Sequence, residues 1–294
     1  MIPHLIFASP RKLPKPASIA GRVVILDVAF AADGIGPGYA KTTLKFINAL
    51  GDRLACWVDH HDHPCHVDYA KDERFVLCTK AEHGACPEMI SPELVAQVGP
   101  IESIVAHFDL DGIYAASKWI LGGKEPYVGA DDDARAVDTR IGPIGPIATM
   151  IDHALRARWS DPVLQNQIVR YLITGQKTGL ELNAIQQAAR EFSENEKGAL
   201  ELAKLYQVRG KVALLKIPAK RPLFDKTELL LLGQQRAVVA IVVDGANMSI
   251  AADFASGLNF LELFNIGGGM PTRVSLPEKR LPEVLAILHR RMGD

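Results

Sequence analysis

The stretch from Ile104 to Ala116 constrains the fold more than any other part of the sequence. It reads Ile-Val-Ala-His-Phe-Asp-Leu-Asp-Gly-Ile-Tyr-Ala-Ala. The apolar residues at its start are typical of a buried strand, and Gly112 followed by further apolar residues is typical of a turn into a helix. The stretch therefore predicts a strand, a turn and a helix in immediate succession.

Side chains with metal-binding chemistry alternate at the end of this strand. His107, Asp109 and Asp111 are spaced so that, in a strand, all of them would point to one face. Carboxylates held so close repel each other and raise a pKa unless a cation offsets their charge. Carboxylate with imidazole suits manganese, magnesium, iron or zinc, and manganese fits a carboxylate-rich set best. The alternative is a core histidine followed by aspartates that cap the helix.

A further aspartate follows another apolar strand. Val23–Leu26 is a continuous apolar run of the kind found in buried parallel strands, and Asp27 comes directly after it. The carboxyl end of such a strand is where open α/β sheets bind ligands. The alternative is a loop aspartate that caps the next helix.

Histidines gather in the next part of the chain. The predicted strand Leu54–Val58 is followed by the segment Asp59–His66, and six of the nine histidines lie between His60 and His107. The alternatives to a functional role are a polar loop and a zinc site that uses Cys65 and His66, although no standard zinc-ligand spacing is present.

An acidic segment, Asp131–Asp133, lies beyond the opening stretch and is predicted to be a loop. Asp133 and Asp138 are candidate metal ligands there. Arg135 and Arg140 have the guanidinium geometry that holds a phosphate in a bidentate manner. The alternative is a solvated acidic surface.

The remaining pattern predicts strands and helices that alternate along the chain. Strands are predicted at His4–Ser9 and Arg74–Thr79, and helices at Lys41–Leu50, Ile147–Ile173 and Asn183–Val208. Beyond Gly210 the pattern predicts a small α/β domain. Within it, Gly267, Gly268 and Gly269 are suited either to an anion-binding nest or to a turn between a helix and a strand.

Composition restricts the function. The net charge of −1 argues against capture of a long polyanion by a basic surface. No apolar run reaches the roughly 18 residues expected of a membrane span, so no membrane association is expected. The four cysteines contain no C-x-x-C pair, and the first residues lack the pattern of a signal peptide. We therefore expect a cytoplasmic protein.

Taken together, these motifs resemble the DHH phosphoesterase superfamily, which includes RecJ-type exonucleases, short-oligonucleotide hydrolases, cyclic-dinucleotide phosphodiesterases and family II pyrophosphatases. The residues that carry the resemblance are Asp27, Asp59-His60-His61, His107-Phe108-Asp109-Leu110-Asp111-Gly112 and Gly267-Gly268-Gly269. The resemblance implies an α/β fold in which a parallel sheet with helices on both faces spans residues 1–182. A helical connector at residues 183–210 and a smaller α/β substrate-binding domain at residues 211–294 would follow.

The chain departs from the family pattern in two respects. The family places the strand that carries His-x-Asp-x-Asp first, whereas here it comes after the Asp27 and Asp-His-His segments, as in a circular permutation. In addition, Met270 stands where the glycine signature normally continues with histidine. Recognition of the substrate by the C-terminal domain would therefore differ.

The resemblance also implies a set of site residues. Two manganese ions, with magnesium or cobalt as substitutes, would be held by Asp109 with His107 and by Asp111 with His60 and Asp138, with Asp27 between them. His61 would contact phosphate or assist the leaving group, so that the catalytic residues would be His61, Asp109 and Asp111. The predicted substrate-binding residues are His61, Arg135, Arg140, Gly267, Gly268, Gly269 and Arg273.

The implied function is metal-dependent hydrolysis of phosphodiester or phosphomonoester bonds in nucleotides or short oligonucleotides. Long duplex DNA is not an expected substrate, and a homodimer is compatible with the sequence. One alternative is a nucleotide-binding sensor that has lost turnover. Another is a zinc-dependent hydrolase that uses His63, Cys65 and His66.

Overall fold

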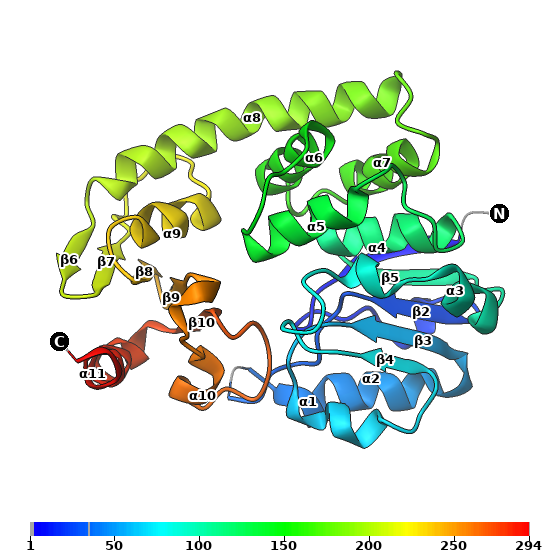
Figure 1. The fold of residues 1–294 in the computed structure, drawn as a ribbon, viewed down its shortest axis with the longest axis horizontal. Coiled ribbons are helices and arrows are strands. Elements are labelled where there is room, and N and C mark those ends of the chain that lie inside the picture. The colour runs from blue at the N-terminus through cyan, green and yellow to red at the C-terminus, as the bar shows by residue number, and fades with distance from the viewer. Residues whose placement is uncertain (1–2, 35, 294) are drawn as a thin grey trace. The chain divides into compact units, whose positions relative to one another are not determined.

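A five-stranded parallel sheet forms the centre of the N-terminal part of the chain in the computed structural model, which describes residues 3–34 and 36–293 (Figure 1). Its spatial order is β1-β5-β2-β3-β4, and every pair of neighbours is parallel. The carboxyl ends of all its strands therefore lie at one edge. The strands are β1 (His4–Ala8), β2 (Val23–Leu26), β3 (Leu54–Asp59), β4 (Phe75–Leu77) and β5 (Ser103–His107).

Both faces of this sheet are buried, as β2 illustrates. Val23 and Ile25 pack in one apolar cluster with helix α2 (Thr43–Leu50), which follows the short helix α1 (Gly38–Lys41). Val24 and Leu26 pack in a second cluster on the other face, with helices α3 (Pro92–Val98) and α4 (Leu110–Ile120). Because successive side chains of a strand point to opposite faces, a strand covered on both sides is apolar throughout. The predicted parallel sheet with helices on both faces is confirmed.

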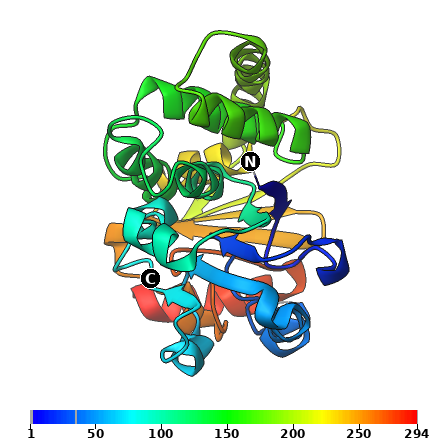
Figure 2. The ribbon, with the colours of Figure 1, turned by 90° about the vertical axis from the view of Figure 1, so that its right-hand side faces the viewer.

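A layer of helices packs on the side of α4 that faces away from the sheet (Figures 1 and 2). It consists of α5 (Ala130–Thr139), α6 (Pro146–Ala157), α7 (Pro162–Ile173) and the start of α8 (Leu180–Ala203). The predicted loop at Asp131–Asp133 is wrong, because these aspartates form the first turn of α5. Carboxylates there interact favourably with the helix dipole, so an acidic run also suits a helix start.

Two predicted helices differ in their limits from those observed. The helical pattern Ile147–Ile173 is divided at Arg158–Asp161, because Asp161 caps α7 and Pro162 occupies its first position. The pattern Asn183–Val208 ends early, since α8 stops at Ala203 and a strand begins at Gln207.

The C-terminal part of the chain forms a second, mixed sheet. Its order is β10-β9-β8-β7-β6, and only β7 and β8 are parallel. The C-terminal end of α8 and helix α9 pack on one face in a single apolar cluster. The predicted smaller α/β domain is confirmed. Its elements are β6 (Gln207–Arg209), β7 (Val212–Lys216), α9 (Lys226–Gln234), β8 (Val239–Asp244), β9 (Asn247–Ala252), α10 (Phe260–Phe264), β10 (Arg273–Pro277) and α11 (Leu281–Met292).

The chain divides into two compact units, Met1–Arg190 and Glu191–Asp294, and the boundary falls within α8. The connector predicted at residues 183–210 and the domain limits next to it stay predictions. Within residues 3–34 and 36–293, no helix combines the length and apolarity needed to cross a membrane.

Gly112 is required where β5 turns into α4. A methyl group added at Gly112 would lie 2.4 Å from the carbonyl oxygen of His107, which belongs to the backbone. The start of α4 would have to move away from β5. We expect Gly112→Ala to lower the free energy of unfolding by about 1–3 kcal/mol, although alanine is the better helix former. Urea denaturation measures this loss.

Gly179→Ala is the matched control, because its added methyl group would meet only the Glu181 carboxylate, at 3.7 Å. We expect that variant to unfold at the same urea concentration as the wild type. If both variants lost the same free energy of unfolding, the close contact between Gly112 and the backbone of His107 would not be the reason that glycine is required.

Candidate metal centre

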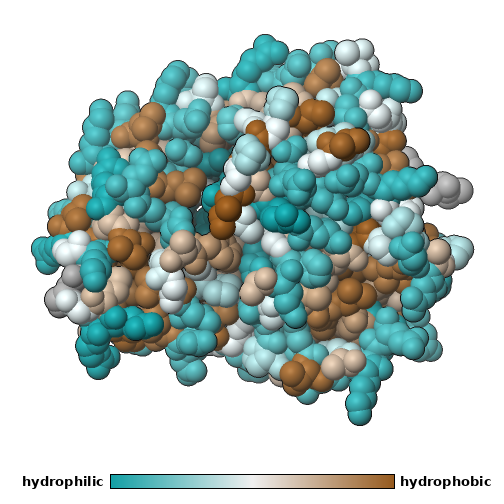
Figure 3. All heavy atoms as spheres, in the orientation of Figure 1, coloured by the Kyte–Doolittle hydropathy of each residue, from teal (hydrophilic) through white to brown (hydrophobic). Residues whose placement is uncertain are grey.

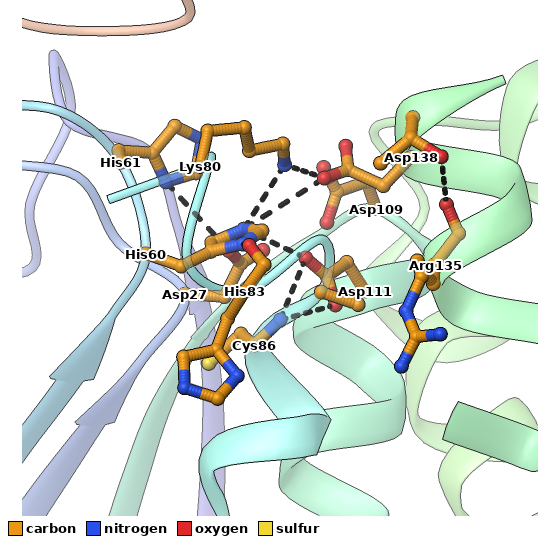
Figure 4. Close-up of polar contacts among 12 residues, drawn as sticks. Asp27, His60, His61, Lys80, His83, Cys86, Asp109, Asp111, Arg135 and Asp138 are labelled. Carbon is orange, nitrogen blue, oxygen red and sulfur yellow. Dashed lines mark hydrogen bonds and ion pairs between the residues drawn. The ribbon is translucent and has the colours of Figure 1, made fainter. Parts of the chain in front are cut away.

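Acidic and imidazole side chains from separate segments meet at the carboxyl edge of the parallel sheet (Figure 4). One comes directly after β2, two follow β3, one ends β5, two lie at the start of α4 and one lies near the end of α5. These residues are Asp27, His60, His61, His107, Asp109, Asp111 and Asp138. The structure therefore brings together the six residues that the resemblance implies as ligands of two ions, together with His61.

Asp27 lies between two groups of ligands. Its Oδ1 is 3.3 Å from Nε2 of His60, and its Oδ2 is 3.7 Å from Nδ1 of His107. The side chain is 1% exposed, and the backbone φ angle is +57°, a left-handed conformation that residues other than glycine adopt at a cost. The two oxygens of this carboxylate therefore face different histidines.

Asp27 belongs to two groups of three converging ligand atoms, one with His60 and His61 and one with His107 and Asp109. In the second of these, Nδ1 of His107 lies 2.8 Å from Oδ2 of Asp109. His60, Asp111 and Asp138 form a third group, in which Nε2 of His60 lies 3.0 Å from Oδ2 of Asp111 and 3.7 Å from Oδ2 of Asp138. Within each group all ligand atoms lie within 4.8 Å of one another.

The alternation predicted for Asp109 and Asp111 is not what brings them together, because β5 ends at His107. Asp109 is the N-cap of α4 and accepts a hydrogen bond from the Gly112 amide through Oδ1, at 3.1 Å. Asp111 lies in the first turn of α4 and accepts from the Cys86 amide at 3.0 Å. The capping alternative is therefore correct for Asp109, and the same residue also belongs to the cluster.

The two histidines after β3 both face the cluster because the strand ends at Asp59, and their ring centroids lie 4.9 Å apart. Nδ1 of His60 donates to the backbone carbonyl of His83 at 2.9 Å, which leaves Nε2 directed at the carboxylates. Nδ1 of His61 lies 2.9 Å from Oδ1 of Asp59, so this buried carboxylate orients the His61 ring.

The electrostatics of the cluster are those of crowded, buried acids. Burial, together with the charges of Asp111 and Asp109, raises the pKa of Asp27 well above its usual value. Burial lowers the pKa of His60, but the carboxylates of Asp111 and Asp27 more than offset this and raise it to about 11. The site therefore favours positive charge.

These residues fit divalent cations. Both carboxylate oxygens of Asp27 are buried and have no hydrogen-bond donor. A buried carboxylate without donors is costly unless a cation contacts it. The groups supply four carboxylates and three imidazoles, and such a carboxylate-rich donor set suits manganese.

Lys80 is a member of the cluster that the sequence analysis did not identify. It follows β4 in the chain, is 4% exposed, and places Nζ against the carboxylate of Asp138 and 3.2 Å from Nε2 of His60 (Figure 4). Burial lowers the pKa of its ammonium group. The only signal in the sequence is its place after a strand of the same sheet.

Only Asp138 among the acidic residues of α5 takes part. Asp133 accepts hydrogen bonds from Tyr127 at 2.8 Å and from the Gly145 amide at 2.6 Å, so it fixes the entry to α6. Asp131 forms an ion pair with Lys118. The remaining member of the acidic run, Asp132, has a side chain that is 79% exposed.

The arginines predicted to bind phosphate lie outside the cluster. The guanidinium group of Arg135 points away from Asp138 in Figure 4 and forms an ion pair with Glu88. Arg140 is the exposed C-cap of α5 and has a φ angle of +63°. Their assignment to substrate binding stays a prediction.

The zinc alternative finds no matching geometry. Among the described residues, no group of three converging ligands includes His63, Cys65 or His66. The rings of His63 and His66 instead pack against Phe30, with centroids 5.5 and 5.0 Å away. The amide of Cys65 donates to Nδ1 of His63 at 3.2 Å.

The predicted glycine signature belongs to the C-terminal unit. Gly268 and Gly269 have φ angles of +116° and +122°, which side chains rarely tolerate. Nη2 of Arg273 donates to Oγ1 of Thr227 at 3.0 Å, and Met270 and Arg273 form an isolated bridge. The proposed contacts of Gly267, Gly268, Gly269 and Arg273 with a substrate stay predictions.

Comparison with known proteins gives only remote similarities. No protein-family model and no curated protein sequence matches the chain. Among solved structures, the pGpG-specific phosphodiesterase PggH from Vibrio cholerae matches with a TM-score of 0.43 and 12% identity, over 93% of this chain and 99% of that one. The exonuclease RecJ bound to manganese matches with a TM-score of 0.44 and 13% identity, over 92% and 75%.

The position of Lys80 predicts how the centre binds metal. A fixed ammonium repels a divalent cation, and two unit charges about 4 Å apart interact by about 4 kcal/mol at an effective dielectric constant of about 20. We therefore expect Lys80→Met, which keeps the side-chain length, to tighten manganese binding tenfold or more. Isothermal titration calorimetry with manganese chloride measures this affinity.

Lys118→Met is the matched control. Lys118 is also buried, but its ammonium contacts Asp131 and the carbonyl of Pro87, outside the cluster. We expect its removal to leave manganese affinity unchanged. If Lys80→Met bound manganese with unchanged affinity, the ammonium would not occupy the group formed by His60, Asp111 and Asp138 in solution.

Proposed function

We propose that the chain is a DHH-type phosphoesterase that hydrolyses phosphodiester or phosphomonoester bonds of nucleotides or short oligonucleotides with two manganese ions. The observation that carries the proposal is the position of Asp27. Its oxygens lie between two groups of ligand atoms, one with His107 and one with His60. A shared carboxylate between two such groups is the arrangement expected of a two-metal hydrolase.

Each residue has a distinct part in the proposed reaction. Asp109 and His107 would hold one ion, Asp111, His60 and Asp138 the other, and Asp27 both. The chemistry that divalent ions supply at such a site is activation of water and neutralisation of charge on the phosphoryl oxygens.

His61 would act on the substrate. Its Nδ1 is held by the buried Asp59 at 2.9 Å, which leaves Nε2 to contact a phosphoryl oxygen or the leaving group. Since His61 is 19% exposed and the adjacent His60 is fully buried, it is the histidine of the pair that a substrate can reach.

Charge supports a small substrate. The net charge of −1 supplies no broad basic surface, whereas binding of long DNA depends on several phosphate contacts. The proposal also includes a cytoplasmic location and a homodimeric state. The location is supported by the cysteines, all four of which are free.

A second candidate is a nucleotide sensor without turnover. It is favoured by Lys80, whose ammonium lies against Asp138 and His60 and thus within one ligand group. If the ammonium stays there when nucleotide binds, that group cannot complete a catalytic metal site. Stoichiometric nucleotide binding without hydrolysis in manganese, magnesium and cobalt would support this candidate over the enzyme.

A manganese-supplemented activity panel tests the proposed function directly. It contains dinucleotides, 3′-phosphoadenosine 5′-phosphate, cyclic dinucleotides, short RNA and DNA, and pyrophosphate. We expect hydrolysis of at least one nucleotide ester and its loss in chelator. Hydrolysis of pyrophosphate alone would contradict the proposal that the substrate is a nucleotide. If no compound were hydrolysed, the proposal that the protein is an enzyme would be wrong.

Asp27→Asn should reduce the number of bound ions. The amide replaces one anionic oxygen of the shared carboxylate, and asparagine tolerates the left-handed backbone found there. We expect elemental analysis of the purified variant to give clearly fewer than two manganese ions per chain, with an unchanged circular dichroism spectrum. A count that stays at two would remove Asp27 from its bridging role.

Asp111→Asn should abolish manganese-dependent hydrolysis and keep the fold. Asparagine retains an oxygen that can accept the hydrogen bond from the Cys86 amide, but it loses the charge that faces His60. The control is Asp132→Asn, because that side chain is exposed and outside the cluster. Full activity of the Asp111 variant after metal stripping and reloading would exclude Asp111 from the centre.

A further inference from the structure

One exposed aromatic residue stands out because it adjoins the metal centre. Figure 3 shows hydrophobic residues in separate patches on a largely hydrophilic face, and isolated apolar side chains on a surface need no explanation. Trp159 is different. It is 61% exposed and lies beside Phe108, which is placed in the chain between His107 and Asp109.

Aromatic rings form a series from the ligand groups to solvent. The centroids of His107 and Phe108 lie 4.5 Å apart, and those of Phe108 and Trp159 lie 5.9 Å apart. The Phe108 and Trp159 rings are tilted by 47°, so neither covers the face of the other completely. The exposed indole of Trp159 is therefore separated from His107, a candidate metal ligand, only by the ring of Phe108.

The backbone that carries Trp159 is held firmly even though the ring is exposed. Its carbonyl accepts a hydrogen bond from Nε2 of Gln165 at 2.8 Å, and Gln165 is 2% exposed. The next turn is fixed by Asp161, which caps α7 through the amides of Val163 and Leu164. A large ring exposed on an anchored turn is preorganised for contact with a ligand.

We propose that Trp159 and Phe108 form a stacking platform for the nucleobase of the substrate. The proposal rests on the proposed function, because it takes the phosphate to lie at the metal centre. Base–aromatic stacking suits any nucleobase, since every base has a π-face. The platform makes the substrate a nucleotide rather than pyrophosphate, which has no planar ring to place there.

The test compares two ligands that differ only in the base. Magnesium-loaded protein is titrated with adenosine 5′-monophosphate and with ribose 5-phosphate by calorimetry. Trp159→Ala should weaken binding of the nucleotide about 5- to 150-fold and leave binding of the sugar phosphate unchanged. Trp159→Phe keeps an aromatic ring and should restore most of the nucleotide affinity.

Fluorescence supplies an independent measurement. Trp57 and Trp119 are 0% and 3% exposed, so iodide quenching of the wild type reports on Trp159. We expect adenosine 5′-monophosphate to protect this fluorescence from iodide and ribose 5-phosphate not to do so. Val163→Ala is the control, because Val163 is similarly exposed, at 66%, and lies in the first turn of α7.

The outcomes separate the two proposals. If the wild type hydrolyses a nucleotide ester but Trp159→Ala binds the nucleotide normally, or loses both ligands equally, the platform is wrong and the proposed function stands. If the wild type binds neither ligand and hydrolyses no ester, both proposals are wrong. A selective loss of the nucleotide that Trp159→Phe reverses supports the platform.

Discussion

The parallel pairing of β5, β2 and β3 is the constraint on which the centre depends. These strands are neighbours in the order β5-β2-β3, so the segments that follow them leave the sheet at the same edge. Asp27 directly follows the middle strand of the three and therefore lies between His60, which follows β3, and His107, which ends β5. An antiparallel arrangement would place one of the three groups at the opposite end of the sheet.

Burial of the converging carboxylates determines what the site can bind. Helices cover both faces of the sheet, and the carboxylates of Asp27 and Asp111 at its edge are buried. Like charges in such a place strongly favour a cation, whether a divalent ion or the ammonium of Lys80. At the group formed by His60, Asp111 and Asp138, a divalent ion would therefore compete with the ammonium of Lys80. The sequence motifs give no indication of this competition.

The order of the motifs along the chain matters less than the order of the strands in the sheet. The His107 strand comes last of the three in sequence, yet it lies beside β2. A rearranged chain can thus keep the same neighbours, because hydrogen bonding between strands is indifferent to the connection that links them.

The sequence by itself determined the strands of the parallel sheet, its two covered faces and the ligand candidates, because apolar runs and the residues that follow them are local patterns. The residues alone left Asp133 and Asp138 as equal candidates, and only the family resemblance implied Asp138. Tertiary structure alone decided that Asp131–Asp133 begin a helix, that Asp109 caps α4, and that His60 and His61 both turn inward after Asp59. It alone brought Lys80 to His60 and Trp159 to Phe108, since contacts between residues distant in the chain depend on packing that no local pattern encodes.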